Sequence, residues 1–298
     1  MSNIKDLIKQ DFPGIPEKDI SEYLKDDIKN YNLDDSISLR NIDLVSHLEE
    51  VTIVSKKYYP NQKYITKVYI PKNKKNIERY QVLFVLDGAS FLQDAITPFS
   101  FPILPTIDSL VEENKIPPTI CVFIDPSSEG PGYPIYGGTG NRSVEYDTCS
   151  SDYGSFLINE IIPELKRSLN LKNNFKNMAI MGASSGGSAA FGVSWYHTEY
   201  FNKVLTSIGS FVNIRGSDKY IDFVRKSEKK DIKIYIQDGR NDLNTIFGNW
   251  TIANENLASS LAYKNYNYFF NQGNGGHNYF ALNEIFDEAL IWLLNDQC

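Results

Sequence analysis

The stretch Met178-Ala179-Ile180-Met181-Gly182-Ala183-Ser184-Ser185-Gly186 places a short apolar run directly before the pattern Gly-x-Ser-x-Gly. The apolar run is typical of a strand buried on both faces, and the small residues that follow Gly186 predict a closely packed helix. A sharp turn from strand to helix strains the backbone of the central serine, so the positions beside it must be small. The stretch therefore predicts a nucleophile elbow with the Ser184 hydroxyl above a sheet. Because ordinary glycine- and serine-rich turns also contain this pattern, the prediction requires catalytic partners elsewhere in the chain.

Other apolar runs indicate the sheet that such an elbow needs. Continuous apolar stretches predict parallel strands that are covered on both faces; they lie at 82–86, 120–124, 178–181 and 232–236. Alternating residues at 51–55 and 64–71 predict antiparallel strands at one edge, and a last strand is expected at 268–270. Helices are expected at 153–170, 251–264 and 284–294. Because strands and helices alternate, we predict an α/β-hydrolase fold: a mostly parallel central sheet, antiparallel N-terminal edge strands, and helices on both faces.

The length of the chain bounds its domain organisation. Its 298 residues contain no repeat and no linker rich in proline, glycine or serine, so one large α/β domain is expected. We predict a catalytic domain over residues 46–298. Residues 1–45 lack a long, regular spacing of apolar residues. They are expected to form an N-terminal helical extension that packs on the main domain.

Charge and hydropathy exclude several kinds of partner. The formal net charge is −7 and the lysines are scattered among acidic residues, so neither nucleic acid nor an anionic membrane is expected as a partner. No apolar run is long enough to span a bilayer, and the first residues lack the apolar core of a signal peptide. As the sequence stands we expect a cytoplasmic protein, or a secreted one if a signal was removed. The sequence does not indicate an oligomeric state.

A nucleophilic serine needs a base, and the chain has only three histidines. His277 lies in the glycine-rich loop 272–278, directly after the last predicted strand, where an α/β-hydrolase places its base. The glycines permit the backbone to approach the sheet closely. His47 precedes the sheet and His197 lies in an aromatic stretch, so structural or surface positions are expected for both. His277 is therefore the predicted base.

The acid that orients this histidine should follow the strand before the last one. The segment 234–243 offers Asp238 at the strand end and Asp242 deeper in the loop. Asp238 directly precedes Gly239, a common arrangement in structural turns. We favour Asp242 as the acid, with Asp238 fixing the loop. The resulting chain order of Ser184, Asp242 and His277 is that of α/β-hydrolases.

Acyl transfer also needs two donors for the tetrahedral oxyanion. The amide of Ser185, directly after the nucleophile, is the first predicted donor. The second is expected in the turn after the strand 82–86, where Asp87 and Gly88 favour a tight turn. Ala89 is preferred, with Gly88 as the alternative. The alternative interpretation is that this segment forms a turn with no catalytic role.

From about Glu50 to its C-terminus the chain resembles the enterochelin-esterase-like branch of the α/β-hydrolases, which also holds feruloyl esterases and mycolyltransferases. The matching segments are 86–88, 124–126, 141–147, 156–163, 182–187, 237–243 and 275–277. In feruloyl-esterase relatives the acid occupies the place of Asp242. In mycolyltransferases the amide after the Asp-Gly pair helps to form the oxyanion hole, which points to Ala89. The first 45 residues have no counterpart in this resemblance.

Two further segments are predicted to border the cleft. Arg142 and Glu145 resemble the R-x-x-E element of the family, in which an arginine lines the cleft of siderophore esterases. An ion pair between Arg142 and Glu145 that pins the loop is the alternative. The glycine- and tyrosine-rich segment 130–138 follows a predicted strand on the side where such sheets bind ligands, so Tyr133 and Tyr136 are expected beside the substrate. A surface loop whose tyrosines pack on the domain is the other interpretation.

Together these features predict a serine carboxylic-ester hydrolase that forms an acyl-enzyme and uses neither metal nor organic cofactor. The substrate is expected to be a small-molecule or glycan-linked ester, with aryl esters such as feruloyl esters suggested by the tyrosines. A catecholate-siderophore esterase of the enterochelin type is one alternative. An acyltransferase on the same fold and a catalytically silent binding protein are the others.

Overall fold

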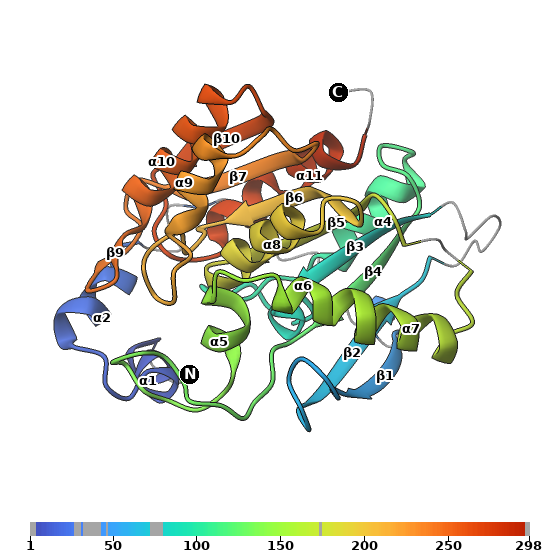
Figure 1. Cartoon of the computed structure of the whole chain (residues 1–298), viewed down its shortest axis with the longest axis horizontal. Helices are drawn as coiled ribbons and strands as arrows, with labels where there is room; N and C mark the ends of the chain where they lie inside the picture. The colour runs from blue at the N-terminus through green and yellow to red at the C-terminus, as the bar shows by residue number, and fades with distance from the viewer. Residues whose placement is uncertain are drawn as a thin grey trace.

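The centre of the molecule is a twisted sheet with helices packed on both sides (Figure 1). The computed structural model describes residues 4–26, 31, 43–45, 47–71, 80–172 and 175–295. Within these ranges the sheet has eight strands in the order β1-β2-β4-β3-β5-β6-β7-β10. The strands are β1 (Glu49–Val54), β2 (Lys63–Tyr69), β3 (Gln81–Leu86), β4 (Thr119–Ile124), β5 (Met178–Ala183), β6 (Phe201–Ser207), β7 (Lys233–Gly239) and β10 (Asn267–Gly273).

The strand directions follow the predicted pattern. The strands β1 and β2 pair antiparallel, and β2 also pairs antiparallel with β4. All further neighbours from β4 to β10 are parallel. The mostly parallel sheet with antiparallel N-terminal edge strands is therefore confirmed. Parallel strands require long connections, and in this chain helices supply them.

The sheet separates two apolar cores because successive side chains of a strand point to opposite faces. In β3, Phe84 and Leu86 enter one core, whereas Leu83 and Val85 enter the other. The first core lies under α5 (Arg142–Asp147), α6 (Asp152–Phe156), the π-helical turn η4 (Leu157–Ile161), α7 (Ile162–Ser168), α8 (Ser185–Tyr196), α9 (Lys219–Lys226) and α10 (Trp250–Tyr263). The second lies under the 3₁₀ turn η3 (Gly88–Phe91), α4 (Leu104–Glu112) and α11 (Phe280–Leu294). Helices on both faces are thus confirmed.

One central strand is not among those predicted from the sequence. The strand β6 lies between β5 and β7, yet Asn202 and Lys203 interrupt its apolar run. Lys203 is buried despite its charge. Because polar residues early in the strand interrupt the continuous apolar pattern of a buried strand, β6 cannot be recognised from that pattern.

The strand β5 meets the helix α8 at the predicted elbow. Ser184 has φ 56° and ψ −125°, a strained backbone conformation for a residue with a side chain. A Cβ atom on Gly182 would lie 2.3 Å from the backbone oxygen of Gly186. Only glycine at position 182 therefore lets the strand and the helix approach this closely.

Part of the N-terminal segment is described, and it carries its own small apolar cluster. The helices α1 (Ile4–Asp11) and α2 (Glu17–Tyr23) lie beside the short hairpin β8 (Asn244–Thr245) and β9 (Gly248–Asn249) and the loop before α5 (Figure 1). Ile8, Ile15 and Ile20 pack with Tyr136 of the main domain. The rest of the predicted 1–45 extension, residues 1–3, 27–30 and 32–42, lies outside the described residues. Within the described ranges, each helix is too short or too polar to cross a bilayer.

We predict that Gly182→Ala destabilises the fold by at least about 2 kcal/mol, because the added methyl group must separate β5 from α8. The measurement is the free energy of unfolding in urea. Gly273→Ala is the matched control: its Cβ would have its nearest neighbour 3.9 Å away, so a change within about 0.5 kcal/mol is expected. Equal stabilities for both variants would contradict the role of Gly182.

Candidate active site

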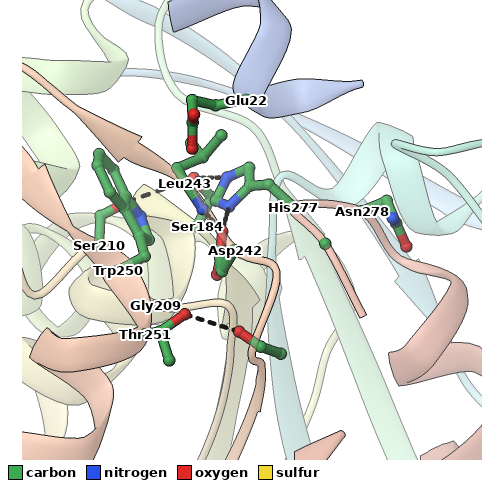
Figure 2. A network of polar contacts seen from close by, with 12 residues as sticks. Glu22, Ser184, Gly209, Ser210, Asp242, Leu243, Trp250, Thr251, His277 and Asn278 are labelled. Carbon is green, nitrogen blue, oxygen red and sulfur yellow. Dashed lines mark hydrogen bonds and ion pairs between the residues drawn. The ribbon is translucent and has the colours of Figure 1, made fainter. Parts of the chain in front are cut away.

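Three predicted residues from separate loops meet at the ends of β5, β7 and β10 (Figure 2). Ser184 Oγ lies 2.9 Å from His277 Nε2. His277 Nδ1 lies 2.6 Å from Asp242 Oδ1. The imidazole therefore bridges the hydroxyl and the carboxylate in the arrangement of a nucleophile, a base and an orienting acid.

Backbone contacts between two loops hold the acid and the base together. The loop after β7 carries Asp242, and the loop after β10 carries His277. Asn241 donates its amide hydrogen to the Gly275 carbonyl at 3.0 Å. A Cβ atom on Gly239 would lie 1.9 Å from that same carbonyl oxygen, so the close passage of the loops requires glycine there.

The two aspartates have different surroundings. Asp242 Oδ1 accepts the hydrogen bond from the Leu243 amide at 2.6 Å in addition to its contact with His277. Asp238 is fully buried at the end of β7. Burial and the neighbouring charge of Asp242 raise the pKa of Asp238 well above its usual range. Burial also raises the pKa of Asp242, while the neighbouring Asp238 carboxyl and the hydrogen bond from the Leu243 amide oppose the rise.

The imidazole of His277 is also buried. Burial lowers the pKa of His277 from its usual value; the charge of Asp238 opposes this effect and that of Arg142 adds to it. The ring is therefore neutral at neutral pH. With Nδ1 carrying its hydrogen toward Asp242, Nε2 has a free lone pair directed at the hydroxyl of Ser184.

Ser184 lies between a broad cleft and a narrow recess. The cleft has a volume of about 430 Å³, and Ser184, His277, Tyr133 and Arg142 are among its lining residues. The recess has a volume of about 30 Å³ and extends from Ser184 past Ser210 to Trp250. The cleft is large enough for a small organic ligand, whereas the recess has room for little more than a methyl group or a water molecule.

The two predicted oxyanion donors have different environments. Ser185 begins α8, where the first amide hydrogens of a helix have no partner within the helix. The amide of Ala89 instead donates to Asp125 Oδ1 at 3.0 Å, so it does not match the prediction of a donor held ready for substrate. The physical reason is the turn itself. Asp87 adopts a left-handed conformation, and the turn that follows sets Ala89 beside the carboxylate that comes after β4.

Arg142 lines the cleft, but its partner is not the predicted one. Its guanidinium donates to both carboxylate oxygens of Asp87, at 2.8 and 2.7 Å, and to the hydroxyl of Tyr133. Glu145 accepts hydrogen bonds from the Tyr64 hydroxyl and the Ser127 amide instead. The alternative of an Arg142–Glu145 ion pair is therefore wrong, because Asp87 lies closer to the guanidinium and matches it with two parallel hydrogen bonds.

The two tyrosines occupy different positions. Tyr133 lines both the cleft and the recess, and its hydroxyl lies 3.5 Å from Ser185 Oγ. Tyr136 is buried and lines only the narrow recess, with its hydroxyl bound to Asp19 of the N-terminal segment. Tyr133 is therefore the one of the pair that faces the broad cleft.

Several lining residues were not predicted from the sequence. Ser210 Oγ lies 3.3 Å from Ser184 Oγ and accepts a hydrogen bond from the Trp250 indole at 3.0 Å (Figure 2). Phe12 and Tyr23 come from the N-terminal segment and line both cavities. None of these four belongs to a recognisable motif. Only their aromatic or small polar character could have suggested a place near a ligand.

The strand order, the elbow and the loop positions define an α/β-hydrolase fold, and comparison with known proteins specifies the family. A family model described as "Putative esterase" matches residues 58–293, so the chain belongs to that family. The Iron(III) enterobactin esterase of Escherichia coli O6:H1 is 25% identical over 134 residues, which are 45% of this chain and 29% of the relative. The chain thus spans less than a third of the length of this curated relative.

Solved structures show the same fold at low identity. The enterobactin esterase from Shigella flexneri, solved in the presence of enterobactin, has a TM-score of 0.65 and 19% identity; the match covers 83% of this chain and 58% of that one. A ferulic acid esterase from Anaeromyces mucronatus, solved in complex with ferulic acid, has a TM-score of 0.61 and 15% identity. That match covers 82% of this chain and 89% of the other.

We predict that the ring of His277 titrates below the usual histidine value of about 6.5. Burial favours the uncharged ring, so the imidazole stays neutral as the pH falls through this value and gains its proton only at lower pH. The measurement is an NMR titration of the imidazole resonances, with His277→Gln identifying the signal. A midpoint at or above the usual value would contradict the prediction.

Proposed function

We propose that this protein is a serine carboxylic-ester hydrolase in which Ser184 is the nucleophile, His277 the base and Asp242 the orienting acid. The observation that carries the proposal is the continuous contact from Ser184 Oγ through the His277 ring to Asp242, at the floor of a cleft of ligand size. Membership of the esterase family agrees with it. The strained conformation of Ser184 presents the hydroxyl where a substrate carbonyl can reach it.

The proposed reaction proceeds through an acyl-enzyme. Ser184 Oγ attacks the ester carbonyl while His277 Nε2 accepts its proton. The carbon–oxygen bond to the alcohol then breaks, and His277 returns the proton to the leaving oxygen. A water molecule, activated by the same imidazole, attacks the acyl-enzyme and releases the acid. Asp242 keeps the ring in the required tautomer and stabilises its charged form.

The oxyanion needs two donors, and Ser185 and Tyr133 are the proposed pair. The Ser185 amide lies at the free N-terminus of α8. The Tyr133 hydroxyl accepts a hydrogen bond from Arg142, and its own hydrogen can turn from Ser185 Oγ, 3.5 Å away, to the substrate oxygen. The positive charge of Arg142 favours a developing negative charge beside it. Tyr133 thus supplies what the Ala89 amide, bound to Asp125, does not.

The proposed substrate is an uncharged ester that carries an aromatic group, such as a feruloyl ester. The rings of Phe12, Tyr23 and Tyr133 line the cleft and suit a flat aromatic partner. A ferric catecholate is strongly anionic. Among the described residues that line the cleft, the acidic groups are Asp11 and Asp87, and the guanidinium of Arg142 is already paired with Asp87. Because the cleft offers acidic groups and no unpaired positive charge among these residues, it favours an uncharged aryl ester over an anionic ferric catecholate.

We predict that Ser184→Ala lowers the turnover of methyl ferulate by about a thousandfold or more, because the nucleophile is lost. Release of ferulic acid is measured by chromatography. A fluorophosphonate probe should label the parent chain at Ser184 and leave the variant unlabelled. Adding an alcohol as acceptor separates hydrolysis from acyl transfer. Turnover of the variant equal to that of the parent would exclude this mechanism.

We predict that Tyr133→Phe lowers kcat for the same ester by about a hundredfold, because one oxyanion donor is removed. The phenylalanine ring preserves the shape of the cleft, so KM should change far less than kcat. Steady-state kinetics on both proteins provides the measurement. A rise in KM with kcat unchanged would instead assign Tyr133 to ground-state binding.

A further inference from the structure

The N-terminal segment, defined here as residues 4–26, forms one wall of the broad cleft. Six of its residues line the cavity that Ser184 and His277 also line; they are Leu7, Ile8, Gln10, Asp11, Phe12 and Tyr23. Figure 1 places α1 and α2 beside the hairpin β8–β9 and the loop before α5. This segment precedes residue 58, where the family match begins. The wall is therefore built from a part of the chain that the family model does not cover.

The wall is attached to the loops that carry the acid and the base. The Asn244 amide, two residues after Asp242, donates to Glu22 Oε2 at 3.0 Å. The Gly276 amide and the Asn278 side chain, on either side of His277, donate to Asp26 Oδ2 at 3.0 and 2.9 Å. Contacts to both loops fix the position of the segment relative to the reacting atoms.

A second set of contacts attaches the segment to the tyrosine-rich loop. The Gly14 amide donates to the Tyr136 carbonyl at 2.7 Å, and the Tyr136 hydroxyl donates to Asp19. Ile15 and Ile20 bury their side chains in the same cluster. Because polar and apolar contacts both contribute, the wall is an ordered part of the site rather than a loosely attached tail.

Two aromatic rings of the segment frame the cleft. The ring of Phe12 meets that of Tyr133 edge to face, with the ring centres 4.8 Å apart. The ring of Tyr23 meets the imidazole of His277 at 90° and 5.5 Å. Phe12 is only partly buried and lines both cavities. A flat aromatic group bound in the cleft would thus meet the rings of Phe12 and Tyr23 in the same cavity as Ser184.

We propose that the N-terminal segment determines substrate specificity, with Phe12 as the residue that selects esters of aromatic acids over esters of aliphatic acids. The inference rests on the proposed ester hydrolysis and names its substrate class. The ring of Phe12 contacts those of Tyr133 and Tyr136, and it takes no part in the hydrogen bonds that join Ser184, His277 and Asp242. Its removal should therefore alter the choice of acyl group more than the chemical step.

The test compares kcat/KM for methyl ferulate and methyl butanoate, two esters with the same leaving group. In Phe12→Ala the ratio of the two values should fall about tenfold, the magnitude of one lost aromatic contact with the substrate. Phe12→Tyr retains the ring and should preserve the ratio. Ile15→Ala is the matched control, because Ile15 packs in the same cluster without lining the cleft, so its ratio should equal that of the parent chain.

A second measurement separates this inference from the proposed function. Calorimetry gives the affinity of Ser184→Ala for ferulic acid, with and without Phe12→Ala. Weaker binding by the double variant supports the role of Phe12 in recognising the aromatic group, even if no ester is hydrolysed. An unchanged ratio and unchanged affinity would overturn the inference while hydrolysis by the parent chain still stood. An equal loss for both esters in Phe12→Ala and Ile15→Ala would also overturn it, since the segment would then only support the fold.

Discussion

The close contact between β5 and α8 is the constraint on which the rest of this molecule depends. It holds Ser184 in a conformation that costs about 1–3 kcal/mol for a residue with a side chain. Hydrogen bonds secure both sides of the strained residue: its amide donates to the Ser207 carbonyl at 2.9 Å, and its carbonyl accepts from the Ser210 amide at 3.0 Å. The burial of α8 against the sheet offsets the strain and keeps the hydroxyl at the floor of the cleft.

Burial also sets the electrostatics of the site. His277 and Asp242 are both shielded from water, and burial together with the charge of Asp242 raises the pKa of Asp238 well above its usual range. The imidazole faces the carboxylate of Asp242 on one side and the serine hydroxyl on the other. This arrangement suits a base that must accept one proton and return it within the same reaction.

The N-terminal segment contributes both to the cleft and to the support of the catalytic residues. It forms one wall of the cleft, and it contacts the loops that carry the acid and the base. Asp26 and Glu22 reach those loops from a part of the chain more than 200 positions away, as the hydrogen bonds to Gly276 and Asn244 record. The proposed selection of aromatic acyl groups follows from the same placement, since Phe12 lines the cleft that contains the nucleophile. The segment thus combines contacts to the loops of the acid and the base with the proposed recognition of the substrate.

The sequence by itself determined the sheet, with the exception of β6, and the positions of Ser184 and His277, because apolar runs, glycine patterns and the scarcity of histidine are local or countable properties. It favoured Asp242 over Asp238 as the acid without excluding Asp238, and its preferred oxyanion amide, that of Ala89, is bound to Asp125. Only the tertiary structure placed Asp242 at the imidazole, Arg142 on Asp87, and Phe12 and Tyr23 in the cleft. The physical reason is distance along the chain: hydrogen bonds and ring contacts between remote segments depend on how the loops fold back, which no local pattern records.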